Sequence, residues 1–440
     1  MKKLLAILLV LLLTVTCVSC AKQPAADSSA PAPEPAAEVP AAVPETSETE
    51  TPEILTCGNY EYILDDGTAT IVRFTDFDYE GELVIPDTLD GVRVTGIMSY
   101  AFAERSYIPG VTNPVIPGVF YVSPESTEET DAPVIQWDSD QVIVNLDVTN
   151  LETLVSISPD QFTVEEQPLP YSGITGITFP DSLIHIDSQA FDRCSSLSRI
   201  VLPDNLLILG DRAFEWCESL TEVVIPDSLA HVSANPFAGC YQLERIVMSP
   251  DHPYLELRNG MLFEKEYNRL ICCLYNSISG HCVIPDGTVT IGDYSFAGND
   301  LLTSVSIPDS VIRIGSSAFC LCTSLTTITL PESIKEIGWY AFSQTGLTEI
   351  TIPGNITTIG WCSFSECSSL ARVRILDGVN EIQSGAFYNN RSLEEIIVPA
   401  SVTVIGKMAF DTMRNTSVIV VPGSYAEQYC RDNSIPYILN

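Results

Sequence analysis

Apolar residues recur along this chain in a fixed pattern. Each unit holds a short alternating run that usually ends in proline, followed by a second apolar group that usually ends in Ala-Phe. Successive units lie 22 or 23 residues apart, with one interval of 59, as the repeat phenylalanines show: Phe191, Phe214, Phe237, Phe296, Phe319, Phe342, Phe364, Phe387 and Phe410. A period of this length is typical of a solenoid. The pattern therefore predicts a repeat solenoid of about 23 residues per coil, mainly β, with short strands and turns.

Within one unit, the alternation predicts which side chains face the core. Val223 and Ile225 lie on the same side of a strand, and Pro226 ends the pairing where its missing N–H is least costly. The second apolar group, such as Ile314 and Phe319, closes the coil from the opposite wall. All of these residues recur because the coil must close, so none of them is a candidate site residue.

A glycine follows the second apolar group in most units. It stands at Gly210, Gly292, Gly315, Gly338, Gly360 and Gly406. This recurrence indicates either a backbone bend with positive φ or a close approach between neighbouring coils. The sequence leaves both explanations open.

The repeat resembles the BspA-like leucine-rich repeat family of bacterial surface proteins, a branch related to the treponemal type. Near the start, residues 66–71 and 83–97 look like the first unit of that family, and near the end residues 421–429 look like its closing unit. The resemblance implies a leucine-rich repeat array and binding to components of a host or of a neighbouring cell.

The breaks in the pattern suggest a domain organisation. Residues 108–172 interrupt the repeat, are acidic in part, and contain an alternating segment that predicts some β-structure. They are either a functional insertion or a decoration of the surface. The Asn259-Gly260 pair predicts a hairpin inside the longest interval. The expected domains are a signal peptide at 1–19, a tether at 20–56, an N-terminal capping repeat at 57–107, the insertion at 108–172, and the array at 173–440 with a hairpin-bearing repeat at 250–284 and a C-terminal cap at 416–440.

The N-terminus has the pattern of an export signal. Two lysines precede an apolar run from Leu4 to Val15, and a small residue precedes Cys20. Val18-Ser19-Cys20 looks like a bacterial lipobox, which implies lipidation of Cys20; cleavage before Cys17 or plain secretion are the alternatives. The Ala-, Pro- and Glu-rich segment that follows cannot form a core and predicts a tether. We therefore expect a lipid-anchored protein on the cell surface.

Charge limits the classes of partner that we expect, and the positions of the cysteines indicate their role. The chain has 57 Asp and Glu against 21 Lys and Arg, a net charge of -36. Such a surface repels nucleic acid and anionic lipid, so we expect no nucleic-acid partner and contact with a membrane only through the lipid. Five cysteines stand three residues after a repeat phenylalanine and are interpreted as small buried fillers: Cys194, Cys217, Cys240, Cys322 and Cys367.

The sequence offers little chemistry. Its four histidines have no acid or nucleophile at a known spacing, and no hydrolase, zinc-protease or phosphate-loop motif occurs. Cys272, Cys273, His281 and Cys282 could supply metal ligands, but their spacing favours buried fillers and a surface histidine. Asp76, Asp78, Glu80 and Asp87 come close to a calcium loop, although a strand follows where a helix is needed. We predict no catalytic residues, no metal site and no cofactor.

Outward-facing strand positions form the broadest candidate surface. They make a hydroxyl-rich stripe that ends in two arginines, and its candidate binding residues are Thr303, Ser306, Thr327, Thr329, Thr351, Arg372 and Arg374. Such a stripe suits a glycan or an extended protein segment, but ordinary β propensity also explains it. The sequence thus predicts a non-enzymatic, surface-anchored module that binds a protein or glycan partner on a host or neighbouring cell. The alternatives are an envelope-organising lipoprotein without a host ligand and, more remotely, a hydrolase.

Overall fold

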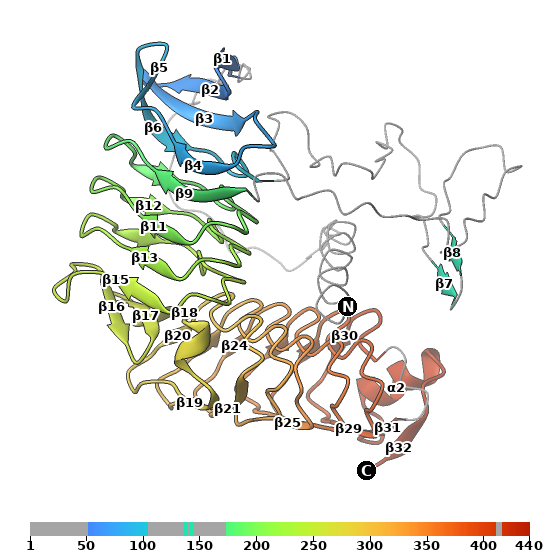
Figure 1. Cartoon of the computed structure of the whole chain (residues 1–440). Coiled ribbons are helices and arrows are strands. Elements are labelled where there is room, and N and C mark those ends of the chain that lie inside the picture. The colour runs from blue at the N-terminus through green and yellow to red at the C-terminus, as the bar shows by residue number, and fades with distance from the viewer. Residues whose placement is uncertain (1–51, 104–135, 139–140, 144–172, 411–415) are drawn as a thin grey trace, which may run out of the picture. The chain divides into compact units, whose positions relative to one another are not determined.

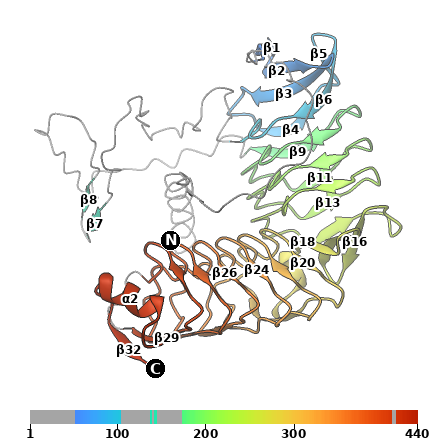
Figure 2. The same ribbon diagram turned by 180° about the vertical axis from the view of Figure 1, so that it is seen from behind.

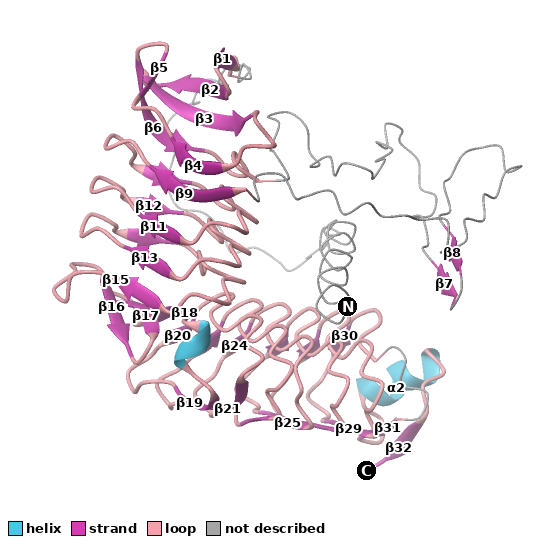
Figure 3. Ribbon diagram, in the orientation of Figure 1, coloured by secondary structure: helices cyan, strands magenta, loops and turns pink. Residues whose placement is uncertain are grey.

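In the computed structural model, each repeat forms one coil of a parallel β-solenoid (Figure 1). The structure describes residues 52–103, 136–138, 141–143, 173–410 and 416–440, and the parts 52–103, 173–410 and 416–440 lie in one compact unit, Thr51–Asn440. Paired residues of adjacent coils are separated by one repeat, as Ile291 pairs with Ile314. The predicted fold class is therefore confirmed. Short strands and turns make up nearly all of the described chain (Figure 3).

The coils before residue 250 build two sheets, one on each wall of the solenoid; the first is parallel, and the second is parallel except where β1, β2 and β5 pair antiparallel. The strands of the first wall are β4 (Gly81–Val84), β9 (Ile174–Thr178), β11 (Arg199–Val201), β13 (Glu222–Val224) and β15 (Arg245–Val247). Those of the second are β1 (Leu55–Cys57), β2 (Tyr60–Asp65), β3 (Thr68–Phe74), β5 (Thr88–Leu89), β6 (Val92–Ile97), β10 (His185–Ile186), β12 (Ile208–Leu209) and β14 (His231–Val232). We call these coils the N-terminal array.

The coils after residue 280 repeat the arrangement and form the C-terminal array. Its first wall has β19 (Gly280–Val283), β21 (Leu302–Ser306) and β23 (Thr327–Ile328) in one sheet, then β25 (Glu349–Ile352), β27 (Arg372–Ile375), β29 (Glu395–Val398), β31 (Ser417–Val420) and β32 (Tyr437–Leu439) in another. Its second wall has β20 (Thr290–Ile291), β22 (Arg313–Ile314), β24 (Glu336–Ile337), β26 (Thr358–Ile359), β28 (Glu381–Ile382) and β30 (Val404–Ile405). Helix α2 (Tyr425–Asp432) precedes the last strand.

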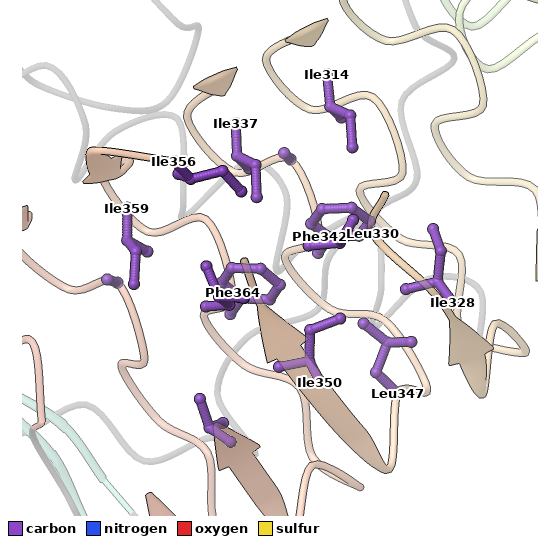
Figure 4. Packing of buried hydrophobic residues seen from close by; sticks show 14 of the residues in the cluster. Ile314, Ile328, Leu330, Ile337, Phe342, Leu347, Ile350, Ile356, Ile359 and Phe364 are labelled. Carbon is purple, nitrogen blue, oxygen red and sulfur yellow. The ribbon is translucent and has the colours of Figure 1, made fainter. Parts of the chain in front are cut away.

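The repeat phenylalanines form the centre of the core. Their rings stack from coil to coil at centroid distances of 4.8–6.3 Å, in one run from Phe74 to Phe237 and a second from Phe296 to Phe410. Figure 4 shows Phe342 and Phe364 between isoleucines of the two walls. Each coil contributes one ring at the equivalent position, so the period observed in the sequence is the period of this stack.

Coil stacking continues across the interruption at 108–172. Strand β9 pairs directly with β4, and β10 pairs with β6, although more than 70 residues separate each pair along the chain. The ring of Phe102 also stacks on that of Phe191 at 4.8 Å. Between residues 104 and 172, the structure describes only β7 (Gln136–Asp138) and β8 (Gln141–Ile143), which pair antiparallel. The rest of the insertion lies outside the described residues.

A pair of hairpins links the two arrays (Figure 2). Strands β16 (Leu255–Arg258), β17 (Met261–Glu264) and β18 (Arg269–Cys273) pair antiparallel, and Asn259-Gly260, both with positive φ, form the first turn. In β17, Leu262 packs in the core of the N-terminal array, whereas Met261 and Phe263 pack in that of the C-terminal array. This strand is therefore buried on both faces and belongs to both cores.

The recurrent glycines serve close approach rather than a bend. None of the six has a positive φ. A Cβ atom added to Gly338 would lie 2.4 Å from the backbone nitrogen of Ser316 in the preceding coil, and one added to Gly210 would lie 2.4 Å from that of Ser188. The backbone does adopt positive φ nearby, but at non-glycine residues that flank the phenylalanine, such as Ser317 and Leu321.

The repeat cysteines are more than fillers. Each of the five is buried, and each thiol donates to a phenylalanine carbonyl of the preceding coil, as Cys322 does to Phe296 at 3.1 Å. Where asparagine stands at this position, Asn390 Nδ2 donates to the carbonyl of Phe364 at 2.9 Å. In these six coils the position therefore combines a small side chain with a hydrogen-bond donor.

Candidate functional site

The outward side chains of the first wall of the C-terminal array form two rows across adjacent strands. Strand pairing fixes the first row, which runs through His281, Ser304 and Thr327 and then through Glu349, Arg372, Glu395 and Ser417. The second row includes Val283 and Ser306, then Thr351, Arg374, Ile397 and Ile419. We call these two rows the strand face.

All seven predicted binding residues are exposed. Thr327 and Arg372 lie in the first row, and Ser306, Thr351 and Arg374 lie in the second. Thr329 directly follows β23. Thr303 lies outside both rows, because the outward residue of its strand that pairs with Thr327 is Ser304.

The strand face is divided between two sheets. The sheet that contains β23 ends there, and a new one begins at β25. The coil between them has 22 residues instead of 23, because one residue is missing between Phe342 and Leu347. Gly346 occupies the shortened turn, where an added Cβ would lie 2.3 Å from the carbonyl oxygen of Thr323. The strand pairing along the stripe is therefore interrupted between Thr327 and Thr351, although the backbone N–H of Thr348 still donates to the carbonyl of Thr326 at 3.3 Å.

The two arginines of the strand face differ in their electrostatic surroundings. Arg372 donates to Glu349 on the neighbouring strand at 2.9 Å, and this hydrogen bond, together with the charge of the carboxylate, raises the pKa of the guanidinium. Glu395 lies beside it on the other neighbouring strand. Within the described residues, no carboxylate lies within ion-pair distance of Arg374. Arg374 is therefore the cation of this face that remains available to a partner.

His281 is a member of the strand face that the sequence reasoning missed. Its Nδ1 lies 2.8 Å from Ser304 Oγ and its Nε2 lies 3.1 Å from Ser306 Oγ, both on the adjacent strand. The signal was present in the sequence, because His281 stands one period before Ser304. Cys282 directly follows His281, and this neighbour favoured its interpretation as a possible metal ligand or a surface histidine.

The contacts of His281 also bear on the hydrolase alternative. A histidine beside a serine hydroxyl is the first element of a nucleophile and base pair. Here, however, both ring nitrogens face hydroxyls, and the ring is exposed on an open strand surface. In a triad, a buried carboxylate fixes the tautomer and preorganised donors stabilise the oxyanion. The arrangement therefore suits a cross-strand polar contact better than an acyl-transfer site.

The equivalent face of the N-terminal array is different in character. Glu222 accepts from Arg199 at 2.8 Å on one side and from Arg245 on the other, so the charges in this row compensate one another. The adjacent row contains Val201, Val224 and Val247 where the C-terminal array has hydroxyls and Arg374. Hydroxyls are therefore fewer in the N-terminal array, where Thr178 is the hydroxyl of the adjacent row.

The family model described as "BspA type Leucine rich repeat region" matches six copies at residues 164–262 and 289–417, just over half of the chain. This chain belongs to the BspA-type leucine-rich repeat family. The family resemblance inferred from the repeat pattern is thus confirmed. A search of curated proteins by sequence finds no match.

Several solved structures are similar to this BspA-type protein. The pneumococcal vaccine antigen PcpA is 18% identical, with a TM-score of 0.51, covering 89% of this chain and 100% of its own. A leucine-rich repeat protein from Eubacterium ventriosum is 19% identical, with a TM-score of 0.42 and coverage of 55% and 83%. A leucine rich cell surface protein from Faecalibacterium prausnitzii is 20% identical, with a TM-score of 0.35 and coverage of 88% and 99%. At this identity, the likeness to PcpA shows a common fold.

The two candidate metal sites of this BspA-type protein do not converge. Cys272 packs in the core of the N-terminal array and Cys273 against that of the C-terminal array, while the His281 ring lies on the outer surface. Asp76 accepts from Asn59 Nδ2 at 3.3 Å, and Asp78 and Glu80 are exposed in a turn that leads into β4. Throughout the part of the chain that the structure describes, no three His, Cys, Asp or Glu side chains are grouped to hold a metal ion.

A cavity of about 20 Å³ lies at the junction between the arrays. Its lining includes Asn299 and Ser295, whose side-chain nitrogen and oxygen are buried without a protein partner. Asn299 occupies the donor position of its coil, but the hairpins displace the preceding coil that would supply the carbonyl. The volume is enough for about one water molecule and not for a substrate.

No helix within the described ranges is long and apolar enough to span a membrane.

Proposed function

We propose that this BspA-type protein is a non-enzymatic interaction module that is held at the cell surface by a lipid on Cys20 and binds a protein partner through the strand face. The observation that carries this proposal is the pair of outward rows on the C-terminal array, with hydroxyls on β21 and β23 and alternating charges on β25, β27 and β29. A surface of this kind is open and extended rather than enclosed, so it suits a large ligand better than a small substrate.

The charge distribution supports a protein partner with basic and acidic groups. The net charge of -36 favours approach of a basic surface, and complementary charges increase the rate of association. Once docked, the hydroxyls of Ser306 and Thr351 can donate and accept hydrogen bonds, and Arg374 can pair with a carboxylate. Membership of the BspA-type family supports display at the cell surface.

The surface role is tested with the full chain on an array of extracellular-matrix proteins and mucins. We expect saturable binding that Arg374→Glu weakens at least about tenfold, because the reversed charge repels the carboxylate that Arg374 would bind. The matched control is Arg391→Glu, the same charge change at an exposed arginine that precedes β29 and is not part of either row. Equal binding by both variants would exclude the strand face as the binding surface. An array on which no protein binds would favour an envelope-organising role.

Anchoring is tested separately, since Cys20 lies outside the described residues. We expect Cys20→Ser to release the protein from the membrane fraction and to abolish incorporation of a labelled fatty acid. The control is Cys17→Ser, which should leave both unchanged. Labelling that is lost only in the Cys17 variant would instead place the processing site before Cys17.

A further inference from the structure

Two adjacent coils carry tryptophan where the other coils carry smaller residues. Three residues before the repeat phenylalanine stand Trp339 and Trp361. The same position in the other coils has Ser188, Asp211, Ala234, Asp293, Ser316, Ser384 and Lys407. Stacking of the coils does not require an aromatic ring here, because neighbouring coils stack without one. The two tryptophans are therefore a local departure from the repeat.

The two indoles lie together, with Trp339 exposed and Trp361 partly exposed. Trp339 is 59% exposed, and its ring centroid lies 6.4 Å from that of Trp361 at an interplanar angle of 89°. Tyr340 adds a third ring, 5.2 Å from Trp361 at 70°. The backbone N–H of Tyr340 donates to the carbonyl of Trp361 and joins the two tryptophan coils, and the N–H of Ser317 in the preceding coil donates to the carbonyl of Trp339. The cluster therefore stands on a rigid backbone.

Trp216 shows how a tryptophan is covered in this solenoid. A Cβ atom added to Gly239 in the next coil would lie 2.8 Å from its ring, and the ring of Tyr241 lies 5.6 Å away. Trp216 is thus packed under the following coil and is only partly exposed. Trp339 has a comparable ring contact with Trp361 but remains largely in water, so packing does not account for its presence.

The aromatic cluster is separate from the strand face. Trp339 and Trp361 each follow the second-wall isoleucine of their coil by two residues, Ile337 and Ile359 respectively. Figure 4 shows these isoleucines across the core from Ile328 and Ile350, which lie on the strands of the first wall. A ligand on the tryptophans would therefore not touch the rows that carry Arg374.

The cluster is flanked by hydroxyls in its own row, and in the adjacent row of the second wall Glu336 is paired with Arg313 at 3.1 Å. Along the row of equivalent positions, Ser316 precedes Trp339 and Ser384 follows Trp361, and both serines are partly exposed. The nearest charged residues in that row are Asp293 and Lys407, each one coil farther away. A cationic ligand would be recognised best where carboxylates flank the rings. Hydroxyls on both sides of the aromatic rings favour a neutral ligand with an apolar face and hydroxyl edges.

We propose that Trp339 and Trp361, together with Tyr340, form a platform that binds a neutral glycan. The C–H face of a pyranose ring packs on an indole, while its hydroxyls remain available to Ser316, Ser384 and water. Exposed tryptophans are the residues that contribute most to binding when a partner covers them. This glycan site goes beyond the protein-binding role of the strand face and does not depend on it.

The platform is tested with the full chain and an array of neutral oligosaccharides, together with a lysine-rich peptide as a cationic probe. Binding of the hits is then measured by titration calorimetry, which does not depend on the tryptophans that the variants remove. We expect a hit whose affinity falls at least about tenfold in Trp339→Ser and is lost in the double variant with Trp361→Ser. Serine is the residue of the flanking coils, so these variants should keep the fold.

Two controls separate the possible outcomes. Tyr267→Ala removes a ring that is 60% exposed on the hairpins and should leave glycan binding unchanged. Arg374→Glu tests the strand face and should also leave it unchanged. Glycan binding that survives in the double tryptophan variant, or an array without any hit, would overturn the proposal. Capture of the lysine-rich peptide alone would identify a cation site instead, without altering the test of the strand face.

Discussion

At the scale of single residues, the side chain three residues after a repeat phenylalanine has two roles in six of the coils. It fills the space between two coils, and it donates a hydrogen bond to a backbone carbonyl. The thiol of Cys322 fits between coils and donates to the carbonyl of Phe296, and Asn390 meets the same demand with an amide. Leaving a buried carbonyl without a donor lowers the free energy of unfolding by about 1–3 kcal/mol. Cysteine at this position is therefore retained for its hydrogen bond as well as for its size.

Burial of cysteine thiols, at this position and elsewhere in the core, makes stability depend on pH in the alkaline range. Burial is the largest cause that raises the pKa of Cys282 and Cys367 to about 11 and that of Cys272 to about 12. The unfolded chain deprotonates near the ordinary thiol pKa, so the stabilising effect is complete below that value and is lost as the pH rises toward about 11. These thiols should not affect the urea midpoint of unfolding near neutral pH. Above about pH 9 we expect the midpoint to fall.

The slope of that fall gives the contribution of each thiol. A single group that titrates only in the unfolded state contributes about 1.4 kcal/mol per pH unit. Cys367→Asn places the asparagine of a neighbouring coil at this position, and should therefore reduce the slope by about that amount. A slope that is the same in wild type and variant would show that Cys367 is not the titrating group.

At the scale of the element, each coil must allow its neighbour to approach closely. Gly338 does so because no side-chain atom stands between its backbone and that of Ser316. Gly176 in β9 also lies between coils, but an added Cβ there would meet only the side chain of Glu82 at 3.5 Å. Neither glycine has a positive φ, so the two positions differ in space and not in backbone conformation.

Substitution by alanine should therefore separate these two glycines. We expect Gly338→Ala to lower the free energy of unfolding by about 1–3 kcal/mol, because the new methyl forces the coils apart. Gly176→Ala should change it by less than about 0.5 kcal/mol, since its surroundings can accept a methyl group. Equilibrium denaturation measures both. Equal effects would mean that strand propensity, rather than coil spacing, determines the result.

The hairpins offer a second test at this scale, because adjacent residues of β17 belong to different cores. Leu262→Ala should accelerate hydrogen exchange mainly in the N-terminal array, and Phe263→Ala mainly in the C-terminal array. Each substitution should lower stability by about 2–5 kcal/mol, as is usual for a large buried apolar side chain. Exchange that rises uniformly over both arrays in either variant would show that the described solenoid unfolds as a single cooperative unit.

At the scale of the whole molecule, the net charge of -36 dominates the electrostatics. The described ion pairs, such as Arg199 with Glu222, are local and neutralise only a small part of it. Self-repulsion of a highly charged chain destabilises its compact state. Recognition of a partner therefore takes place against a strongly negative background.

Salt should consequently stabilise this protein. We expect the melting temperature to rise between about 20 mM and about 300 mM NaCl, because the Debye length falls to less than the spacing of most surface charges. The control is Arg199→Gln, which removes one ion pair and should leave the direction of the change intact. A melting temperature that falls with salt would mean that ion pairs outweigh the general repulsion. Calorimetry of the full chain distinguishes the two cases.

Much of this architecture could be predicted from the sequence, because a solenoid repeats its local interactions. The period, the inward positions such as Ile225 and the hairpin at Asn259-Gly260 depend on residues that are close along the chain, or one period apart. The family resemblance has the same origin. The seven candidate binding residues were likewise found as outward strand positions, and all of them are exposed.

Only the tertiary structure determined how neighbouring coils contact one another. It assigned the glycines to close approach, gave the thiols their carbonyl acceptors, and divided the strand face between two sheets near Gly346. It also brought His281 beside Ser304 and placed Trp339 against Trp361. The physical reason is that these contacts depend on the distance and offset between coils, which a repeat pattern implies but does not specify.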